Sequence, residues 1–278
     1  MPYQAEISRV NPTAFLFLID QSGSMEDPWA GNDGGQSKAD ALATIINRLF
    51  TEIVIKCSKD EGVRNYFEIG VLGYGDDVRP ALGSGLAGRL FVPVSEIADT
   101  PIRVEDRVQK VSDGAGGLVD QTVKFPVWFE PRAKGGTPMT EALTQAREAL
   151  DGWIGQHPES FPPIVFNITD GESTDGDPTP AADAVRDLAT TDGTALLFTI
   201  HLSHHRGKVE FPDGEQGLAD DFARRLFRMS SVMPPHLQRE AQAEGFGVND
   251  QSRGFVFNAD SAAVIQFLDI GTRPANLR

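Results

Sequence analysis

The sequence predicts an α/β protein with a doubly wound, mostly parallel sheet and helices on both faces. Continuous apolar runs at 13–19, 164–169 and 194–200 have the length and composition of strands that are buried on both faces. Between these runs, apolar residues recur at helical spacing, as expected for helices that pack one side on a sheet. Strands that alternate with helices favour parallel pairing through right-handed crossovers.

In the first third of the chain, a helix is expected at 37–57 and a second strand at 67–74. The predicted helix has one apolar stripe, formed by Leu42, Ile45, Ile46, Leu49, Phe50, Ile53 and Cys57. A turn at 75–77 leads to residues 78–82, which contain Pro80. Because proline cannot donate to a central ladder, this segment predicts a short antiparallel edge strand.

In the second half, helices are expected at 138–153, 178–189 and 261–270, and a last strand at 254–258. Each helix has apolar residues on one side, and Pro178 suits the first turn of the helix that it begins. Together with the apolar runs, these elements continue the alternation to the end of the chain.

We predict a single domain over residues 1–278 with two insertions at the rim of the sheet. A chain of 278 residues that is 40 % hydrophobic can bury one full core. The insertions are the segments outside the alternating pattern, 83–134 and 202–252. Trp128 and Phe129 in the first insertion belong either to its core or to a docking face.

The formal net charge of −15 argues against nucleic acid and anionic membrane as partners. The sequence has no apolar window long enough to span a bilayer, and residues 1–9 do not resemble a secretory leader. Cys57 is the single cysteine, which excludes an internal disulfide and fits a reducing compartment. We therefore expect a cytoplasmic protein.

Oxygen-bearing side chains stand at the ends of two predicted strands and at the start of a helix. Asp20, Ser22 and Ser24 follow the first strand, Thr137 precedes the helix at 138–153, and Asp170 follows the strand at 164–169. Two carboxylates and three hydroxyls suit a hard cation such as Mg²⁺, with Mn²⁺ or Ca²⁺ as substitutes. Because Mg²⁺ keeps part of its water, such a site leaves a coordination position for an outside oxygen.

The motif Asp-x-Ser-x-Ser, followed by a Thr and then an Asp, resembles the metal-ion-dependent adhesion site of the von Willebrand factor A (vWA) domain family. The resemblance covers residues 10–82 and 135–271. It implies a Rossmann-like, six-stranded sheet in the order 3-2-1-4-5-6, with strand 3 antiparallel at the edge. It also implies that Ser22, Ser24 and sometimes Thr137 bind the metal directly, whereas Asp20 and Asp170 often act through water. The chain looks most like stand-alone bacterial intracellular A-domain proteins of the tellurite-resistance-associated type.

The implied strand order predicts where a ligand would bind. In doubly wound sheets, ligands bind beyond the carboxyl ends of the strands at the point where the strand order reverses. Here that point lies between strands 1 and 4, which end at Asp20 and Asp170. The position of the motif and the expected topology therefore agree.

Several polar residues near this site have alternative interpretations. Thr137 could cap the following helix instead of binding a metal. Glu26, Asp27 and Asp33 are either solvated loop charges or an acidic rim over the ion. Asp175 and Asp177 suggest a second cation site, but helix capping by Asp177 before Pro178 explains the pattern better. His201, His204 and His205 are either surface residues or ligands of a transition metal, and no cysteine or carboxylate lies at zinc-like spacing from them.

The function that these features favour is a binding module without catalysis. Mg²⁺ would accept an Asp or Glu side chain of a partner protein, such as a kinase, phosphatase or ATPase, in a bacterial signalling or stress-response complex. One alternative is a metal-assisted phosphoryl-transfer or hydrolase enzyme. Aspartyl phosphotransferases place a second Asp two residues after the first, however, where this chain has Ser22. Another alternative is an adaptor subunit of an ATPase or chelatase complex, which would use the same site.

Overall fold

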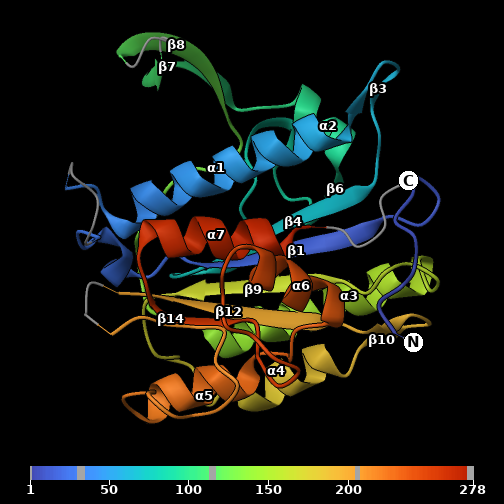
Figure 1. The fold of residues 1–278 in the computed structure, drawn as a ribbon, viewed down its shortest axis with the longest axis vertical. Helices are drawn as coiled ribbons and strands as arrows, with labels where there is room; N and C mark the ends of the chain where they lie inside the picture. Colours follow the sequence, from blue (N-terminus) through green and yellow to red (C-terminus); the bar gives the residue numbers. More distant parts are fainter. Residues whose placement is uncertain (1, 30–34, 113–116, 204–206, 274–278) are drawn as a thin grey trace.

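A computed structural model describes residues 2–29, 35–112, 117–203 and 207–273 of the protein (Figure 1). Its core is an eight-stranded, mostly parallel sheet. The strands are β1 (Thr13–Asp20), β4 (Phe67–Tyr74), β5 (Val78–Pro80), β6 (Phe91–Pro93), β9 (Ile164–Thr169), β12 (Leu196–Leu202), β13 (Val209–Glu210) and β14 (Phe255–Ala259). They lie in the order β13-β14-β12-β9-β1-β4-β5, and β6 also pairs with β4.

The six predicted strands are β1, β4, β5, β9, β12 and β14, and they have the expected order 3-2-1-4-5-6. β5 is antiparallel to β4, as its proline suggested. The predicted number of six strands was wrong, because β6 and β13 add two antiparallel strands. These two strands have three and two residues, which is too short for a periodic apolar pattern.

Helices cover both faces of the sheet, as predicted (Figure 1). One face carries α1 (Lys38–Cys57), α2 (Val94–Asp99), α6 (Pro235–Ala243) and α7 (Ser261–Gly271). The other face carries α3 (Met139–Gln156), α4 (Thr179–Arg186) and α5 (Asp221–Met229). Alternate residues of β1 pack into the two layers, Phe15 and Phe17 into the first and Leu16 and Leu18 into the second. This double burial explains why β1 reads as a continuous apolar run.

The remaining short elements are two 3-10 helices and two short antiparallel strand pairs. They are η1 (Gly23–Glu26), η2 (Ser84–Leu86), and the antiparallel pairs β2 (Ser58–Lys59) with β3 (Gly62–Val63) and β10 (Ala189–Thr190) with β11 (Gly193–Thr194). Among the residues that the structure describes, none of the helices is long and apolar enough to cross a membrane.

Segment 83–134 adds β6 to the main sheet and then forms a hairpin of β7 (Arg103–Ser112) and β8 (Leu118–Val127). The hairpin is a separate two-stranded sheet that stands away from the main sheet beyond α1 (Figure 1). After β8 the chain returns to the core, where Trp128 and Phe129 are each 2 % exposed. Both residues are therefore core residues, and the alternative that they form a docking face was wrong.

Asn47 of α1 attaches this returning segment to the helix. Its Oδ1 accepts hydrogen bonds from the backbone N–H groups of Trp128 (2.8 Å) and Phe129 (3.0 Å). Its Nδ2 donates to the carbonyl oxygens of Ala43 and Phe129, both at 2.8 Å. All four hydrogen bonds are buried.

We expect Asn47→Ala to lower the free energy of unfolding by about 3 kcal/mol, because it leaves several buried backbone groups without their partner. Urea denaturation followed by circular dichroism would measure this change. Arg48→Ala is the control, since the Arg48 side chain is 64 % exposed on the same helix. Equal stability of the two variants would show that Asn47 does not anchor the segment.

Candidate functional site

The loops that carry the candidate residues meet at one edge of the sheet. Asp20 is the last residue of β1, and Asp170 directly follows β9, which pairs in parallel with β1. The loop after β1 is joined to the loop before α3 by a 3.0 Å hydrogen bond from the Gly23 N–H to the Gly135 carbonyl. Thr137 follows two residues later. The expected position beside the reversal of strand order is therefore observed.

Hydrogen bonds connect four of the five candidate residues, namely Asp20, Ser22, Ser24 and Asp170. Ser22 Oγ lies 3.0 Å from Ser24 Oγ, and Ser24 Oγ donates to Asp170 Oδ1 at 2.7 Å. Asp20 Oδ1 accepts from the Ser22 N–H at 2.8 Å, and its Oδ2 accepts from Thr169 Oγ1 at 2.7 Å. Asp20, Ser22, Ser24 and Asp170 therefore form one hydrogen-bonded group rather than separate loop residues.

Thr137, the fifth candidate, is 5 % exposed and directs its hydroxyl toward the loop after β9. Its Oγ1 lies 3.8 Å from the position that a Cβ atom on Gly171 would occupy. Pro138 is the N-cap residue of α3, and no side-chain hydrogen bond caps that helix from this position. Helix capping therefore does not compete for the Thr137 hydroxyl, which makes no hydrogen bond to the described part of the chain.

The first turn of α3 is instead bonded by Asp175. Its carboxylate accepts from the backbone N–H groups of Thr140 at 3.1 Å and Glu141 at 2.8 Å. Asp177 accepts from the N–H of Thr179 at the start of α4, at 3.1 Å. Both aspartates therefore bind helix ends, as the capping interpretation of Asp177 expected, although the N-cap residue of α4 is Pro178 and not Asp177.

The spacing of the hydroxyls fits a small hard cation. In an octahedral shell with metal–oxygen distances of about 2.1 Å, neighbouring ligand atoms lie about 3.0 Å apart. Ser22 Oγ and Ser24 Oγ have this separation. Each Asp20 oxygen accepts one bond from the residues named above and, because a carboxylate oxygen has two lone pairs, can accept another. The described residues contain no group of three His, Cys, Asp or Glu side chains suited to a metal.

Burial controls the charge of Asp20, which is 1 % exposed. Loss of solvation raises the pKa of its carboxyl group from the ordinary value of 3.8 to about 6, although hydrogen bonds from Ser22 and Thr169 favour the charged form. The nearby charge of Asp170 raises the Asp20 pKa slightly further. A bound cation would offset this cost of ionisation.

Lys38, in the first turn of α1, is a residue of the site that the sequence analysis missed. Its Nζ lies 2.7 Å from Asp170 Oδ2, and the two side chains are 6 % and 0 % exposed. The one signal in the sequence that could have revealed Lys38 is a lysine at a helix N-terminus, where a positive charge is unfavourable.

The acidic residues of the loop before α1 are exposed. Asp27, 65 % exposed, lies 3.8 Å from the Lys38 ammonium group, and Glu26 is also exposed, in line with solvated loop charges. Asp33 lies outside the described residues.

A cavity of about 510 Å³ adjoins the site and is bordered by Lys38, Asp170 and His201. His201 is 7 % exposed and stacks on Phe257, with ring centroids 4.4 Å apart. Burial lowers the pKa of His201 to about 4, so its ring is neutral at pH 7. The expectation of a surface histidine was wrong for His201, and His204 and His205 lie outside the described residues.

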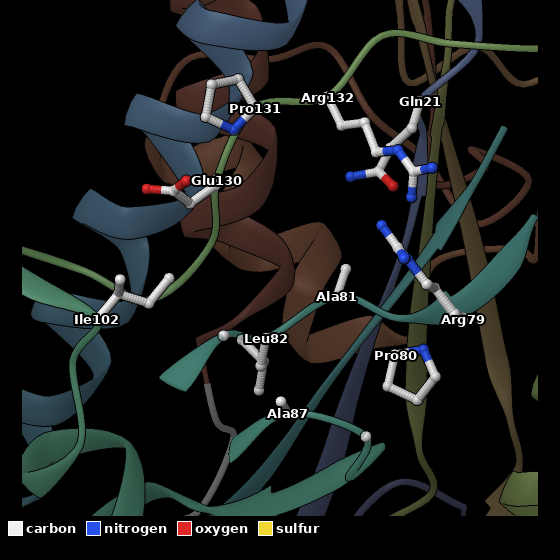
Figure 2. Close-up of a pocket in the computed structure, with 12 residues that line it drawn as sticks. Gln21, Arg79, Pro80, Ala81, Leu82, Ala87, Ile102, Glu130, Pro131 and Arg132 are labelled. Carbon is white, nitrogen blue, oxygen red and sulfur yellow. The ribbon is translucent and has the colours of Figure 1, made fainter. Parts of the chain in front are cut away.

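A second cavity, of about 570 Å³, lies next to the loop after β1 and is bordered by none of the five candidate residues. Gln21, between Asp20 and Ser22 in the chain, borders it, and Figure 2 shows Gln21, Arg79 and Arg132 pointing toward one another. Arg132 forms ion pairs with Asp76 and Asp77, and Arg79 lies 3.5 Å from Asp77. The charges beside this cavity are therefore paired with one another.

Comparison with known proteins found no matching family model and no matching curated protein. Among solved structures, the chain is similar to the vWF domain of the type V pili tip protein Mfa5 from Porphyromonas gingivalis, with 17 % identity, 59 % of this chain and 39 % of that chain covered, and a TM-score of 0.30. It is also similar to the PilB minor pilin from Streptococcus sanguinis, with 14 % identity, 62 % and 31 % covered, and a TM-score of 0.34. A third similar structure is the adhesive tip pilin GBS104 from Group B Streptococcus agalactiae. The identity is 13 %, 86 % of this chain and 72 % of that chain are covered, and the TM-score is 0.29.

These similarities are distant and concern the fold alone. The chain spans about two fifths of the Mfa5 structure and about a third of the PilB structure. The stronger observation is the sheet itself, in which four neighbouring pairs are parallel and the strand order reverses beside β1. The chain therefore has a vWA-like, Rossmann-like fold.

Proposed function

We propose that this protein is a metal-dependent protein-binding module that carries out no chemical step. It would bind Mg²⁺, with Mn²⁺ or Ca²⁺ as substitutes, through Asp20, Ser22, Ser24, Thr137 and Asp170. The metal site would then accept an Asp or Glu side chain of a partner protein. The observation that supports this proposal is the hydrogen-bonded set of Asp20, Ser22, Ser24 and Asp170 at the carboxyl edge of the sheet, with the Thr137 hydroxyl directed toward the same loop as Asp170.

Each group has a separate role in this proposal. The Ser24 hydroxyl donates to Asp170 and is hydrogen-bonded to the Ser22 hydroxyl, so both hydroxyl oxygens are held in place before an ion arrives. Asp20 supplies buried negative charge, and Thr137 supplies a hydroxyl that helix capping does not use. When bound, Mg²⁺ would supply a coordination position for an oxygen atom from outside the chain.

An acidic partner residue needs such a local cation because of the charge of the whole chain. At a formal net charge of −15, the protein repels anions at long range. A bound ion is the largest charge in its surroundings and reverses this repulsion locally. We place the module in the bacterial cytoplasm, in a signalling or stress-response complex with a kinase, phosphatase or ATPase, and we propose neither nucleic acid nor membrane as a partner.

Capture of partner proteins from a native lysate tests this function. We expect immobilised wild-type protein to retain proteins in Mg²⁺ and to release them when EDTA or excess acetate is added. Thr137→Ala should retain much less, whereas Thr144→Ala, an exposed threonine of α3, should behave as wild type. The same retained proteins in all arms would contradict the proposal. Phosphoester turnover that requires Asp20 would instead favour a metal-assisted enzyme.

A further inference from the structure

The ammonium group of Lys38 lies against one of the candidate metal ligands. We propose that Lys38 is a built-in cation of this site, which lowers the affinity for the divalent ion and gives the loaded site a net positive charge. The inference rests on the proposed function and deepens it, because it says why a carboxylate is selected as the outside ligand.

Lys38 is held at this place by several oxygen atoms. Its Nζ lies 2.7 Å from Asp170 Oδ2, 3.3 Å from the Ser24 carbonyl oxygen and 3.8 Å from Asp27 Oδ2. The first turn of a helix disfavours a positive charge, since the helix dipole is positive at that end. The acidic and carbonyl oxygens of the metal loops, rather than α1 itself, therefore stabilise the ammonium group.

Asp170 is shared between Lys38 and the hydroxyl groups. Its Oδ2 accepts from Lys38, and its Oδ1 accepts from Ser24 Oγ, which lies 3.0 Å from Ser22 Oγ. A cation held by these hydroxyls would be separated from the ammonium group by a single carboxylate. Because both Lys38 and Asp170 are nearly excluded from water, the repulsion between the two cations is only weakly screened.

The charges of the contacting groups indicate what the lysine does for partner selection. Among the buried charged groups, Asp20 and Asp170 carry two negative charges and Lys38 one positive charge, which leaves the site with one negative charge before a metal binds. Asp27 is not counted, because its side chain is 65 % exposed and solvent screens its charge. A divalent ion reverses this to one positive charge. Without Lys38, the loaded site would be neutral. A positive site prefers an anionic carboxylate over water, a hydroxyl or an amide as its last ligand.

The ammonium group is also placed to act on an approaching ligand. Lys38 and Asp170 both border the cavity of about 510 Å³ beside the site. A partner side chain that enters this cavity would lie close to the ammonium group as it approaches the Ser22 and Ser24 hydroxyls. Lys38 would thus favour acidic side chains along the path as well as at the ion.

Two effects of Lys38 on metal binding have opposite signs, and this makes the inference testable. Repulsion of the metal lowers the affinity, whereas orientation of Asp170 by its hydrogen bond would raise it. Lys38→Met removes the charge but keeps a long unbranched side chain. We expect this variant to bind Mg²⁺ about tenfold more tightly than wild type in isothermal titration calorimetry, because the repulsion is the larger effect.

Lys134→Met is the matched control. It removes the same charge from a side chain that is 72 % exposed and is paired with Asp76, so its Mg²⁺ affinity should stay at the wild-type value. Unchanged or weaker binding by Lys38→Met would overturn the inference and make Lys38 a structural anchor. Lys38→Gln provides a second neutral side chain if Lys38→Met does not fold, and Lys38→Arg, which keeps the charge, should retain the wild-type affinity.

The selectivity for carboxylates is measured on Mn²⁺-loaded protein with acetate as the probe. Displacement of metal-bound water by acetate lowers the proton relaxation enhancement of the solvent. We expect acetate to bind more weakly to Lys38→Met than to wild type, although that variant holds the metal more tightly. Equal acetate affinity would overturn the selectivity role of Lys38. If neither protein binds Mg²⁺ or Mn²⁺, the proposed function itself fails, and binding without a difference refutes only the inference.

Discussion

Asp20→Asn is expected to weaken Mg²⁺ binding by about 100-fold or more, which corresponds to about 2.7 kcal/mol. Asp20 contributes a buried charge to the site, and its substitution leaves a neutral amide beside the Ser22 N–H and the Thr169 hydroxyl. Isothermal titration calorimetry would measure the affinity. Glu172→Gln is the control, because it removes one negative charge from an exposed residue two positions after Asp170.

The same substitution also distinguishes a functional carboxylate from a structural one. Since burial raises the pKa of Asp20 to about 6, its ionised form costs stability at pH 7 when no metal is bound. Asp20→Asn in EDTA should therefore be at least as stable as wild type in urea denaturation. A large loss of stability in EDTA would identify Asp20 as a structural residue, and undiminished Mg²⁺ binding would refute its assignment to the site.

The stability of the metal-free protein is expected to decrease as the pH rises, because Asp20 loses its proton. The pKa of this carboxyl group is about 6 in the folded state, whereas its ordinary value, which applies to the unfolded chain, is 3.8. The folded state therefore binds the proton more tightly than the unfolded state does. The resulting stabilisation is fully present below about pH 4 and is lost as the pH rises through about 6. From the shift in pKa, the loss amounts to about 3 kcal/mol at most.

Urea denaturation in EDTA at pH 4 and pH 7 measures this loss, and Asp20→Asn provides the reference for all other titrating groups. Wild type should lose more stability than the variant between the two pH values. Parallel profiles of the two proteins would contradict the expected titration. In the presence of Mg²⁺, stability should instead increase as the pH rises, because protons compete with the metal for Asp20. The Mg²⁺ affinity of wild type should fall about tenfold for each pH unit below 6.

The sequence by itself determined the alternation of strands and helices. β1, β9 and β12 are buried on both faces of the sheet, so every residue in each strand has to be compatible with a buried position. α1 and α3 bury one side each, which produces a helical period. The candidate residues Asp20 and Asp170 were found for the same reason, since they stand where the apolar runs end.

Only the tertiary structure decided which residues act on these carboxylates. Lys38 and Asp170 are separated by 132 positions in the chain, and Asn47 and Phe129 by 82, so no local pattern reveals either contact. The same limit applies to β6 and β13, which are too short to have a period and are identified by their pairing with β4 and β14. Local periodicity therefore sets the elements and the position of the site, whereas the charge balance of the site depends on long-range contacts that form only when the sheet is assembled.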